Sequence, residues 1–342
     1  MDCRVKPGHD GWRACEPEGQ TTIMARGRGR KRRGRPVSGW LVLNKPLDMT
    51  STEAVNIVKR LYDARKVGHG GTLDPLATGV LPIAFGEATK TVQFVMDSPK
   101  TYRFTVRWGE ERSTDDAEGE VVETSAERPA REDIEALLPV FTGEIMQVPP
   151  TFSAIKVKGE RAYDLARDGE QVELKPRPVM IYHLKLIDMP DADTAIFEAE
   201  TGKGAYVRAL ARDMGRELGC FGYVSALERS AVGPFTLEDA ITQEKLEELR
   251  HKDADRTALD AVLLPIATAL DDIPALAVDQ QQAARIASGQ GVLLRGADAP
   301  VAAETVLITW KGRPLALGTV EAGMLKPKRV FNLGNAPGGR KR

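Results

Sequence analysis

The chain has 342 residues and a formal net charge of −1 at pH 7, with 42 % hydrophobic and 28 % charged residues. This balance is typical of a globular protein, and the length predicts two or three domains. It excludes a coiled coil and a low-complexity scaffold. The sequence contains neither an apolar run long enough to span a membrane nor a secretory signal, so we expect a cytoplasmic protein.

Cysteines and histidines are few and widely spaced. Cys3, Cys15 and Cys220 form at most one disulfide, which agrees with a reducing compartment. The four histidines share no short spacing with each other or with a cysteine, whereas zinc sites commonly use such spacing. We therefore expect no metal site.

The charge is unevenly distributed along the chain. Residues 1–39 carry ten Lys or Arg and four Asp or Glu, and the stretch 26–35 reads RGRGRKRRGR. Such a run buries no apolar surface, so we expect 1–39 to be a disordered basic extension, either a phosphate-binding arm or a solvated tail. Met24 is an alternative start of translation. Residues 322–342 carry six Lys or Arg and no acid, which also indicates a polyanionic partner.

The predicted elements begin at residue 40. The run WLVL at 40–43 predicts a short buried strand. A helix follows Thr50, which forms a capping box with Glu53. Three glycines within residues 68–71 predict a break in regular structure.

The middle of the chain predicts strands and helices in mixed order. Residues 101–108 alternate strictly and place one set of side chains on one face of a strand: Tyr102, Phe104, Val106 and Trp108. Residues 110–120 are acidic and polar, so we expect a loop there. The elements predicted next are a helix at 130–138, strands at 179–188 and 194–200, and a helix at 205–218 that ends at Gly219.

This irregular alternation predicts an α+β fold with a large mixed, mainly antiparallel sheet flanked by helices. The main domain is expected to cover residues 40–250, and 251–273 is a predicted linker or helical segment. The strings TVLITW and LALGTV, joined by the turn KGRP, predict a hairpin in a small β-rich domain at 274–335. Residues 336–342 form a basic tail.

Asp74 is the one acid in the stretch GHGGTLDPLATGVLP at 68–82. Pro75 steers Asp74 toward an extended backbone, while Leu73 and Leu76 anchor the loop, so the carboxylate is presented for chemistry. An ionised Asp acts as a nucleophile or a base when it is held against an electrophilic carbon. From local chemistry alone, the alternative that Asp-Pro merely starts a turn is favoured.

The Asp74 loop is one of several motifs along residues 40–250, which read in order LNKPLDMTS, GHGGTLDPLATGVLP, FGEATK, VPPTFSAIKVKGERAYDLAR and GAYVRALARDMG. Together with the strand around Tyr102, they resemble the bacterial tRNA pseudouridine-55 synthase (TruB) family. The segment 274–335, which contains LALGTVEAGMLKPKRVF, resembles the small RNA-binding β-barrel called PUA.

The resemblance implies a pseudouridine synthase domain that isomerises one uridine in the T-loop of tRNA without a cofactor. The base is flipped out, its N-glycosidic bond breaks, and it rejoins the sugar through carbon 5. The family's essential aspartate matches Asp74, which either attacks the sugar or takes a proton from it. A glycosidase uses two carboxylates and ends with water, whereas this loop offers one.

The resemblance also assigns roles to two residues outside the loop. Arg208 matches the arginine that pairs with the catalytic aspartate and would hold it ionised. Its alternative is a solvated helix face, because Arg208, Arg212 and Arg216 are spaced four residues apart. Tyr102 matches a tyrosine that stacks on the base, and core packing explains it equally well.

A further set matches substrate-binding positions of the family. His69 corresponds to a histidine at the site of RNA-loop remodelling, and Tyr206 and Leu227 correspond to residues of the base pocket, although each also fits an ordinary loop or core role. Lys45 belongs to the first, largely structural motif. The segment of the RNA-clamping insertion contributes three candidate phosphate contacts: Lys156, Lys158 and Arg161.

This sequence departs from the family pattern at Asn44, Gly70, the stretch STDD at 113–116, and Glu228. Two other functions stay open at this point: a non-catalytic tRNA-binding or folding protein, and a guide-RNA-dependent pseudouridine synthase. We expect a monomer that binds the tRNA T-arm and has no membrane or metal partner.

Overall fold

The computed structural model describes residues 34–153, 155–157, 160–161, 174–296 and 300–334. Residues 1–33 of the predicted disordered extension, which include Met24, lie outside the described residues, as do Lys158 and the basic tail. The remaining residues of that extension, up to Gly39, are ordered, contrary to the prediction, because Arg35 pairs with Asp260 and Gly39 begins the first strand. The first half contains these elements: β1 (Gly39–Lys45), α1 (Ser51–Tyr62), β2 (Val67–His69), β3 (Ala77–Phe85), η1 (Gly86–Lys90), α2 (Val92–Asp97), β4 (Lys100–Trp108), β5 (Glu110–Arg112), β6 (Val121–Thr124), α3 (Arg131–Leu137), η2 (Leu138–Phe141), β7 (Gly143–Gln147), β8 (Lys156–Val157) and β9 (Glu160–Arg161).

The second half completes the sheet and adds the C-terminal elements. They are β10 (Arg177–Asp191), β11 (Thr194–Thr201), α5 (Val207–Glu217), β12 (Gly222–Val232), β13 (Phe235–Thr236), η3 (Leu237–Asp239), α6 (Gln243–Lys252), α7 (Thr257–Ala261), η4 (Ile266–Leu270), β14 (Ala275–Ala277), α8 (Gln280–Ala287), β15 (Val292–Leu293), β16 (Ala303–Trp310), β17 (Arg313–Glu321) and β18 (Met324–Val330).

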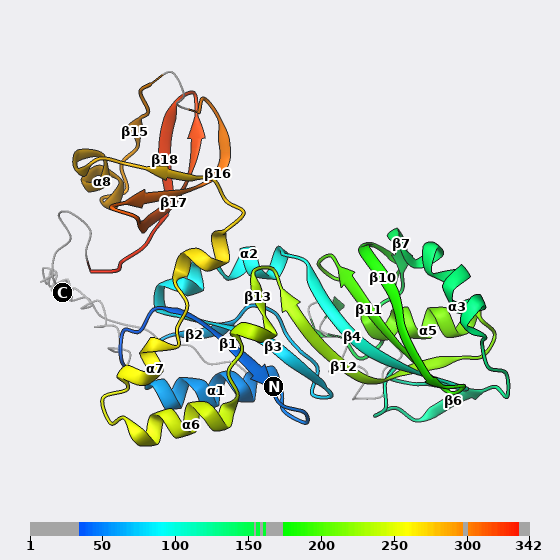
Figure 1. Ribbon diagram of the computed structural model, residues 1–342. Coiled ribbons are helices and arrows are strands. Elements are labelled where there is room, and N and C mark those ends of the chain that lie inside the picture. The colour runs from blue at the N-terminus through cyan, green and yellow to red at the C-terminus, as the bar shows by residue number, and fades with distance from the viewer. Residues whose placement is uncertain (1–33, 154, 158–159, 162–173, 297–299, 335–342) are drawn as a thin grey trace, which may run out of the picture. The chain divides into compact units, whose positions relative to one another are not determined.

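Strands between residues 39 and 236 form one large sheet (Figure 1). Its order is β1-β3-β12-β4-β11-β10-β7, with β2 beside β3 and β13 beside β12. All of these pairs are antiparallel except β3 and β12, which run parallel at Leu227–Arg229. The α+β fold with a mixed, mainly antiparallel sheet flanked by helices is thus confirmed. Strand β12 pairs with both β3 and β4, so it connects the β1-β3 part of the sheet to the β4-β11-β10-β7 part.

Three apolar cores lie against this sheet, and two of them pack helices α1 and α5. Helix α1 begins at the predicted capping box, in which Thr50 Oγ1 accepts from the Glu53 N–H, and it buries Ala54, Val58 and Tyr62 against β1 and β3. Helix α5 packs Leu210 and Met214 on the second core. Strand β4 contributes its predicted apolar face there, with Phe104, Val106 and Trp108 buried.

Two short stretches differ from the sequence predictions. Residues 110–112 form strand β5, paired with β6, where we expected only loop. Gly68 and His69 lie in β2, since they pair with Ala84 and Ile83 of β3 despite the surrounding glycines. The stretch 251–273, predicted as a linker or helical segment, contains the short helices α7 and η4, whose Leu259 and Ile266 are buried.

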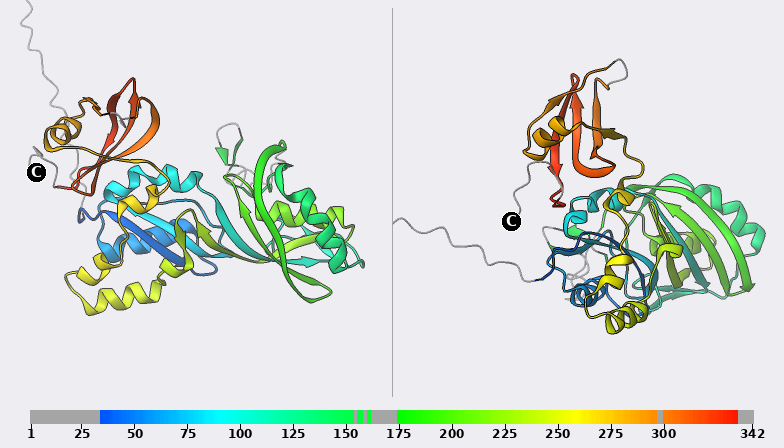
Figure 2. Two further views of the ribbon diagram at one scale, coloured as in Figure 1. Left: turned by 45° about the horizontal axis from the view of Figure 1, so that its top comes forward. Right: turned by 60° about the vertical axis from the view of Figure 1, so that its left-hand side comes forward.

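The C-terminal residues form a second sheet in the order β14-β16-β17-β18-β15, and Figure 2 shows that its strands curl. The predicted hairpin is present as β16 and β17, and Lys311 at its turn has a φ of +50°. Helix α8 closes a small core through Ala283 and Ile286. The expected small C-terminal β-barrel is confirmed as a small β-rich domain, whose five-stranded sheet curls into a half-barrel.

Candidate active site

The turn between β2 and β3 carries Asp74, whose side chain is 41 % exposed. The residue before it is fixed from both sides, because Ser51 Oγ accepts from the Leu73 N–H at 2.8 Å and donates to the Leu73 carbonyl at 3.0 Å. The Asp74 carbonyl accepts from the Ala77 N–H at 3.0 Å. The backbone of the loop is therefore satisfied within the protein while the carboxylate projects outward.

Lys45 supports the same loop from the end of β1. Its side chain is completely buried. Nζ donates to three backbone carbonyls, those of Pro46 at 2.7 Å, Met49 at 2.7 Å and Pro75 at 3.2 Å. Burial lowers the pKa of Lys45 to about 8, against the opposing effect of the Asp74 charge. The lysine of the first motif thus fastens the residue that follows Asp74.

Arg229 of β12 supports the other end of the loop and is 1 % exposed. Its guanidinium donates to three carbonyls, those of Gly71 at 3.2 Å, Thr72 at 3.2 Å and Val80 at 2.9 Å. Burial lowers the pKa of Arg229, whereas Tyr102 and Asp74 oppose that shift. Gly79 has a φ of +99°, and a Cβ there would lie 2.3 Å from the Arg229 carbonyl, so this close approach requires glycine.

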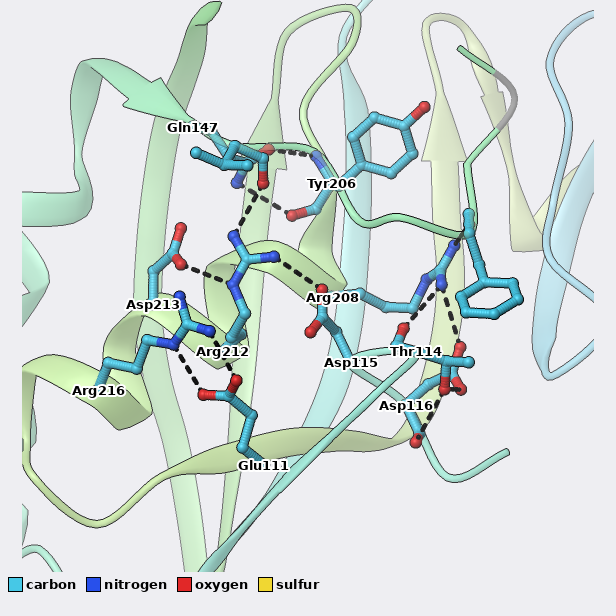
Figure 3. A network of polar contacts seen from close by, with 12 residues as sticks. Glu111, Thr114, Asp115, Asp116, Gln147, Tyr206, Arg208, Arg212, Asp213 and Arg216 are labelled. Carbon is cyan, nitrogen blue, oxygen red and sulfur yellow. Dashed lines mark hydrogen bonds and ion pairs between the residues drawn. The ribbon is translucent and has the colours of Figure 1, made fainter. Parts of the chain in front are cut away.

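Arg208, in the first turn of α5, faces Asp74 across the site. Nη2 lies 2.9 Å from Asp74 Oδ2, and Nη1 lies 3.2 Å from Asp116 Oδ2. The same guanidinium donates to the carbonyls of Thr114 at 2.9 Å and Phe152 at 3.0 Å. Its side chain is 6 % exposed, and four acceptors from three segments fix its orientation. Figure 3 shows its contacts with Thr114 and Asp116.

The three arginines of α5 do not form a solvated face. Arg208 and Arg212 are buried, and the side chain of Arg216 is about half exposed. Each of these arginines pairs with an acid from the stretch 111–116, and Figure 3 shows the three pairs along α5. Arg212 Nη1 lies 2.9 Å from Asp115 Oδ2, and Arg216 Nη2 lies 2.6 Å from Glu111 Oε1. The solvated alternative for this helix is therefore wrong.

The structure places three further candidates around the Asp74 and Arg208 pair. Tyr102, on β4, interacts with Arg229. Leu227, on β12, pairs with Phe104 of β4 and Ala77 of β3 and packs against the cores that hold α1 and α5. Tyr206 precedes α5, and its backbone N–H and C=O both bond to the Gln147 side chain, at 2.8 and 3.1 Å. Neither Tyr102 nor Tyr206 is fully buried.

His69 lies in β2, close to the loop but not in contact with Arg208. Its Nδ1 accepts from the Gly71 N–H at 3.4 Å. Burial, together with the nearby Arg229 charge, lowers the pKa of His69. The backbones of Lys156 in β8 and Arg161 in β9 pair with each other.

Sequence reasoning missed two residues of this site. Arg229 follows Glu228 in a polar stretch that gave no sign of complete burial. Asp116 lies in the STDD stretch, which we recorded only as a departure from the family pattern. An acid 92 residues before Arg208 carries no local signal that the two side chains meet.

Within the part of the chain that the structure describes, no cluster of three or more His, Cys, Asp or Glu is arranged to hold a metal ion. Over the same residues, no helix combines the length and apolar character needed to cross a bilayer.

Comparison with known proteins identifies related chains. Residues 59–207 match the model of the TruB family pseudouridylate synthase N-terminal domain, and residues 208–271 match the tRNA pseudouridylate synthase B C-terminal domain. A protein named tRNA pseudouridine synthase B from Bradyrhizobium diazoefficiens is 62 % identical over 304 residues, covering 89 % of this chain and 88 % of that protein. One of the same name from Brucella ovis is 55 % identical, covering 91 % of this chain and all of its own.

Solved structures share the fold. A Cbf5-Nop10-Gar1 complex matches with a TM-score of 0.66 and 23 % identity, over 86 % of this chain and 84 % of that chain. The archaeal box H/ACA Nop10-Cbf5 complex matches with the same score and identity, over 88 % of this chain and 92 % of that chain.

Proposed function

The chain belongs to the TruB family of pseudouridylate synthases, and we propose that it converts uridine 55 in the T-loop of tRNA to pseudouridine. The observation that supports this most directly is the Asp74 carboxylate, carried by an immobilised loop and held 2.9 Å from the buried Arg208. Relatives that are 55–62 % identical to this chain are named tRNA pseudouridine synthase B, which supports the tRNA part of this proposal. We place the reaction in the cytoplasm, where its tRNA substrate is found.

The chemistry fits a single fixed carboxylate. Uracil leaves C1′ when the N1–C1′ bond breaks, turns within the pocket, and forms the C5–C1′ bond, after which the C5 proton is lost. Asp74 acts either as the nucleophile at C1′ or as the base at C2′. Arg208 fixes the direction of the carboxylate, and its contacts with Asp116 and Thr114 fix Arg208 itself.

The residues around this pair suit a flipped base. We assign Tyr102 to stacking on it, and Tyr206 and Leu227 to the lining of its pocket, because all three side chains are partly exposed. His69 remodels the RNA loop, and Lys45 holds the loop of Asp74. The insertion residues Lys156, Lys158 and Arg161 contact phosphates of the T-arm. The chain works as a monomer without a metal or cofactor.

The test is tritium release from a T-arm hairpin that carries 5-tritiated uridine, because the label leaves when C5 joins the sugar. Asp74→Asn is expected to slow release by at least about 10³-fold, or about 4 kcal/mol. Asp97→Asn is the control, since that carboxylate is similarly exposed and also ion-paired, to Lys203. Equal rates for the Asp74→Asn variant and the wild type would mean that this carboxylate is not catalytic.

Substrate choice is tested with the purified protein alone. We expect it to release tritium from the hairpin, and to release none from a labelled hairpin in which uridine 55 is replaced by cytidine. Activity only after another RNA is added would indicate a guided synthase. Tight binding without any tritium release would indicate a tRNA-binding protein that does not catalyse.

A further inference from the structure

Arg212 is a buried cation one turn after Arg208 on α5, with an exposure of 7 %. Its guanidinium reaches three acceptors. Nη1 lies 2.9 Å from Asp115 Oδ2, Nη2 donates to the Val148 carbonyl at 2.8 Å, and Nε lies 2.9 Å from Asp213 Oδ1. Asp213 is its neighbour on the helix, but Asp115 and Val148 belong to two separate segments. One planar side chain thus joins both segments to α5.

The first segment is the turn at 113–116. Asp115 is 5 % exposed and has a φ of +61°, and its carbonyl accepts from the Val224 N–H of β12 at 3.1 Å. The residues on either side, Thr114 and Asp116, are the ones that contact Arg208 Nη1. A shift of this turn therefore moves two of the four acceptors of Arg208.

The second segment is 147–153, which leads into the insertion that carries Lys156. Gln147 ties it to both backbone groups of Tyr206, and Val148 is tied by Arg212. Four residues later, the Phe152 carbonyl accepts from Arg208 Nη2, the same atom that faces Asp74. The base of the insertion and the Asp74 partner are therefore linked through adjacent residues of α5.

We propose that Arg212 is a positioning residue that clamps the 113–116 turn and the 147–153 segment against α5, and so sets the orientation of Arg208 toward Asp74. This inference rests on the proposed function. Arg208 has no single rigid support, because its acceptors come from the Asp74 loop, the turn and the 147–153 segment. Arg212 fastens two of these three segments, the turn and the 147–153 segment. Small misplacements of a catalytic partner reduce rates by about 100-fold, so the clamp acts on the chemical step.

The closing experiment measures single-turnover tritium release at saturating hairpin, together with hairpin affinity. Arg212→Met is expected to slow release by about 10- to 100-fold and to change the Kd by less than about threefold. Arg216→Met is the matched control, since it removes an arginine–carboxylate pair from the next turn of the same helix. It is expected to leave the rate within about twofold of wild type.

A double variant tests whether Arg212 acts by fastening the two segments or only by neutralising the charge of Asp115. If Arg212 only neutralises the buried Asp115, the double substitution Arg212→Met with Asp115→Asn restores the rate. Under the clamp, the double variant stays slow because the bond to the Val148 carbonyl is still missing. A restored rate, or a normal rate per folded molecule with only a lower melting temperature, would overturn the proposal.

Hydrogen exchange tests the clamp without relying on catalysis. Arg212→Met is expected to speed amide exchange in both 113–116 and 147–153, whereas Arg216→Met leaves 147–153 unchanged. Unchanged exchange at 147–153 in the Arg212→Met variant would refute the clamp. A wild-type chain that releases no tritium would refute the proposed function, and the exchange result would still decide whether Arg212 fastens both segments.

Discussion

The two sides of the Asp74 and Arg208 pair are built on different principles. On the loop side, the buried cations Lys45 and Arg229 donate to six backbone carbonyls around Asp74. On the helix side, each arginine of α5 pairs with a side-chain carboxylate, and Arg208 and Arg212 also donate to three backbone carbonyls of neighbouring segments. Cations bound to carbonyls fix a backbone, whereas arginine–carboxylate pairs fix the direction of side chains.

This difference predicts where substitutions act. A carbonyl that loses its buried donor keeps its full desolvation penalty, so the loop side should control whether the fold is stable. In the outer helix pair Arg216 is about half exposed and Glu111 is buried, so water reaches this pair more than the inner ones and it should contribute less to stability. The following predictions go from the largest expected effect to the smallest.

Arg229→Met is expected to lower the free energy of unfolding by about 4 kcal/mol, because the buried carbonyl of Val80 and the partly buried carbonyls of Gly71 and Thr72 lose their shared donor. Urea unfolding measures this value. Arg103→Met, an exposed arginine of β4, is the control and should change stability by less than about 0.5 kcal/mol. A loss below about 1 kcal/mol for Arg229→Met would show that the carbonyl contacts on the loop side do not control the stability of the fold.

Lys45→Met is expected to lower the free energy of unfolding by about 3 kcal/mol, since the carbonyls of Pro46, Met49 and Pro75 are left without their shared donor. Thermal and urea unfolding measure it. Lys59→Met removes an exposed lysine of α1 and should be nearly neutral. Comparable losses for the two lysines would show that the carbonyl contacts contribute nothing.

Asp115 makes a pH-dependent contribution on the helix side. Burial raises the pKa of Asp115 to about 6, against the opposing effect of Arg212. The folded chain therefore binds this proton more tightly than the unfolded chain, and the contribution of Asp115 to stability falls as the pH rises from about 4 to 6. Relative to Asp115→Asn, wild type should lose at most about 3 kcal/mol across this window. Urea unfolding at several pH values measures the difference, and a constant difference would contradict the raised pKa.

His69 is expected to show the smallest effect. Burial and the charge of Arg229 lower the pKa of His69, so its imidazole should titrate below the usual 6.5. The folded chain therefore favours the neutral imidazole. The contribution of His69 to stability is present at neutral pH and is lost as the pH falls below about 6.5. NMR titration gives the midpoint, and His69→Gln identifies the resonance. A midpoint at or above 6.5 would show that Arg229 does not influence this side of the loop.

The sequence predicted the elements whose signals are local. The Thr50 capping box, the alternation of β4 and the helix that ends before Gly219 each depend on neighbouring residues, and all three are present. The exposed carboxylate of Asp74 also followed from local features, namely Pro75 and the flanking leucines. The short strand at 110–112 was missed because its partner, β6, decides whether it forms.

The supports of the site could not be predicted in the same way. Arg229 is buried because β12 pairs with β3 and β4 at once, and that register is a property of the assembled sheet. Asp116 meets Arg208 only after the turn at 113–116 folds back on α5. A charged residue in a polar stretch looks solvated until such tertiary contacts are known.

Synthesis on the ribosome gives the β12 contacts a further consequence. The carbonyls that Arg229 holds lie 149 to 158 positions earlier in the chain. The Asp74 loop therefore emerges from the exit tunnel long before its anchor does, and contacts of such high sequence separation form late in folding. Chains terminated before residue 229 carry the reactive carboxylate on a loop that Lys45 and Ser51 hold but Arg229 does not, so the nascent protein reaches its working form only when translation is well advanced.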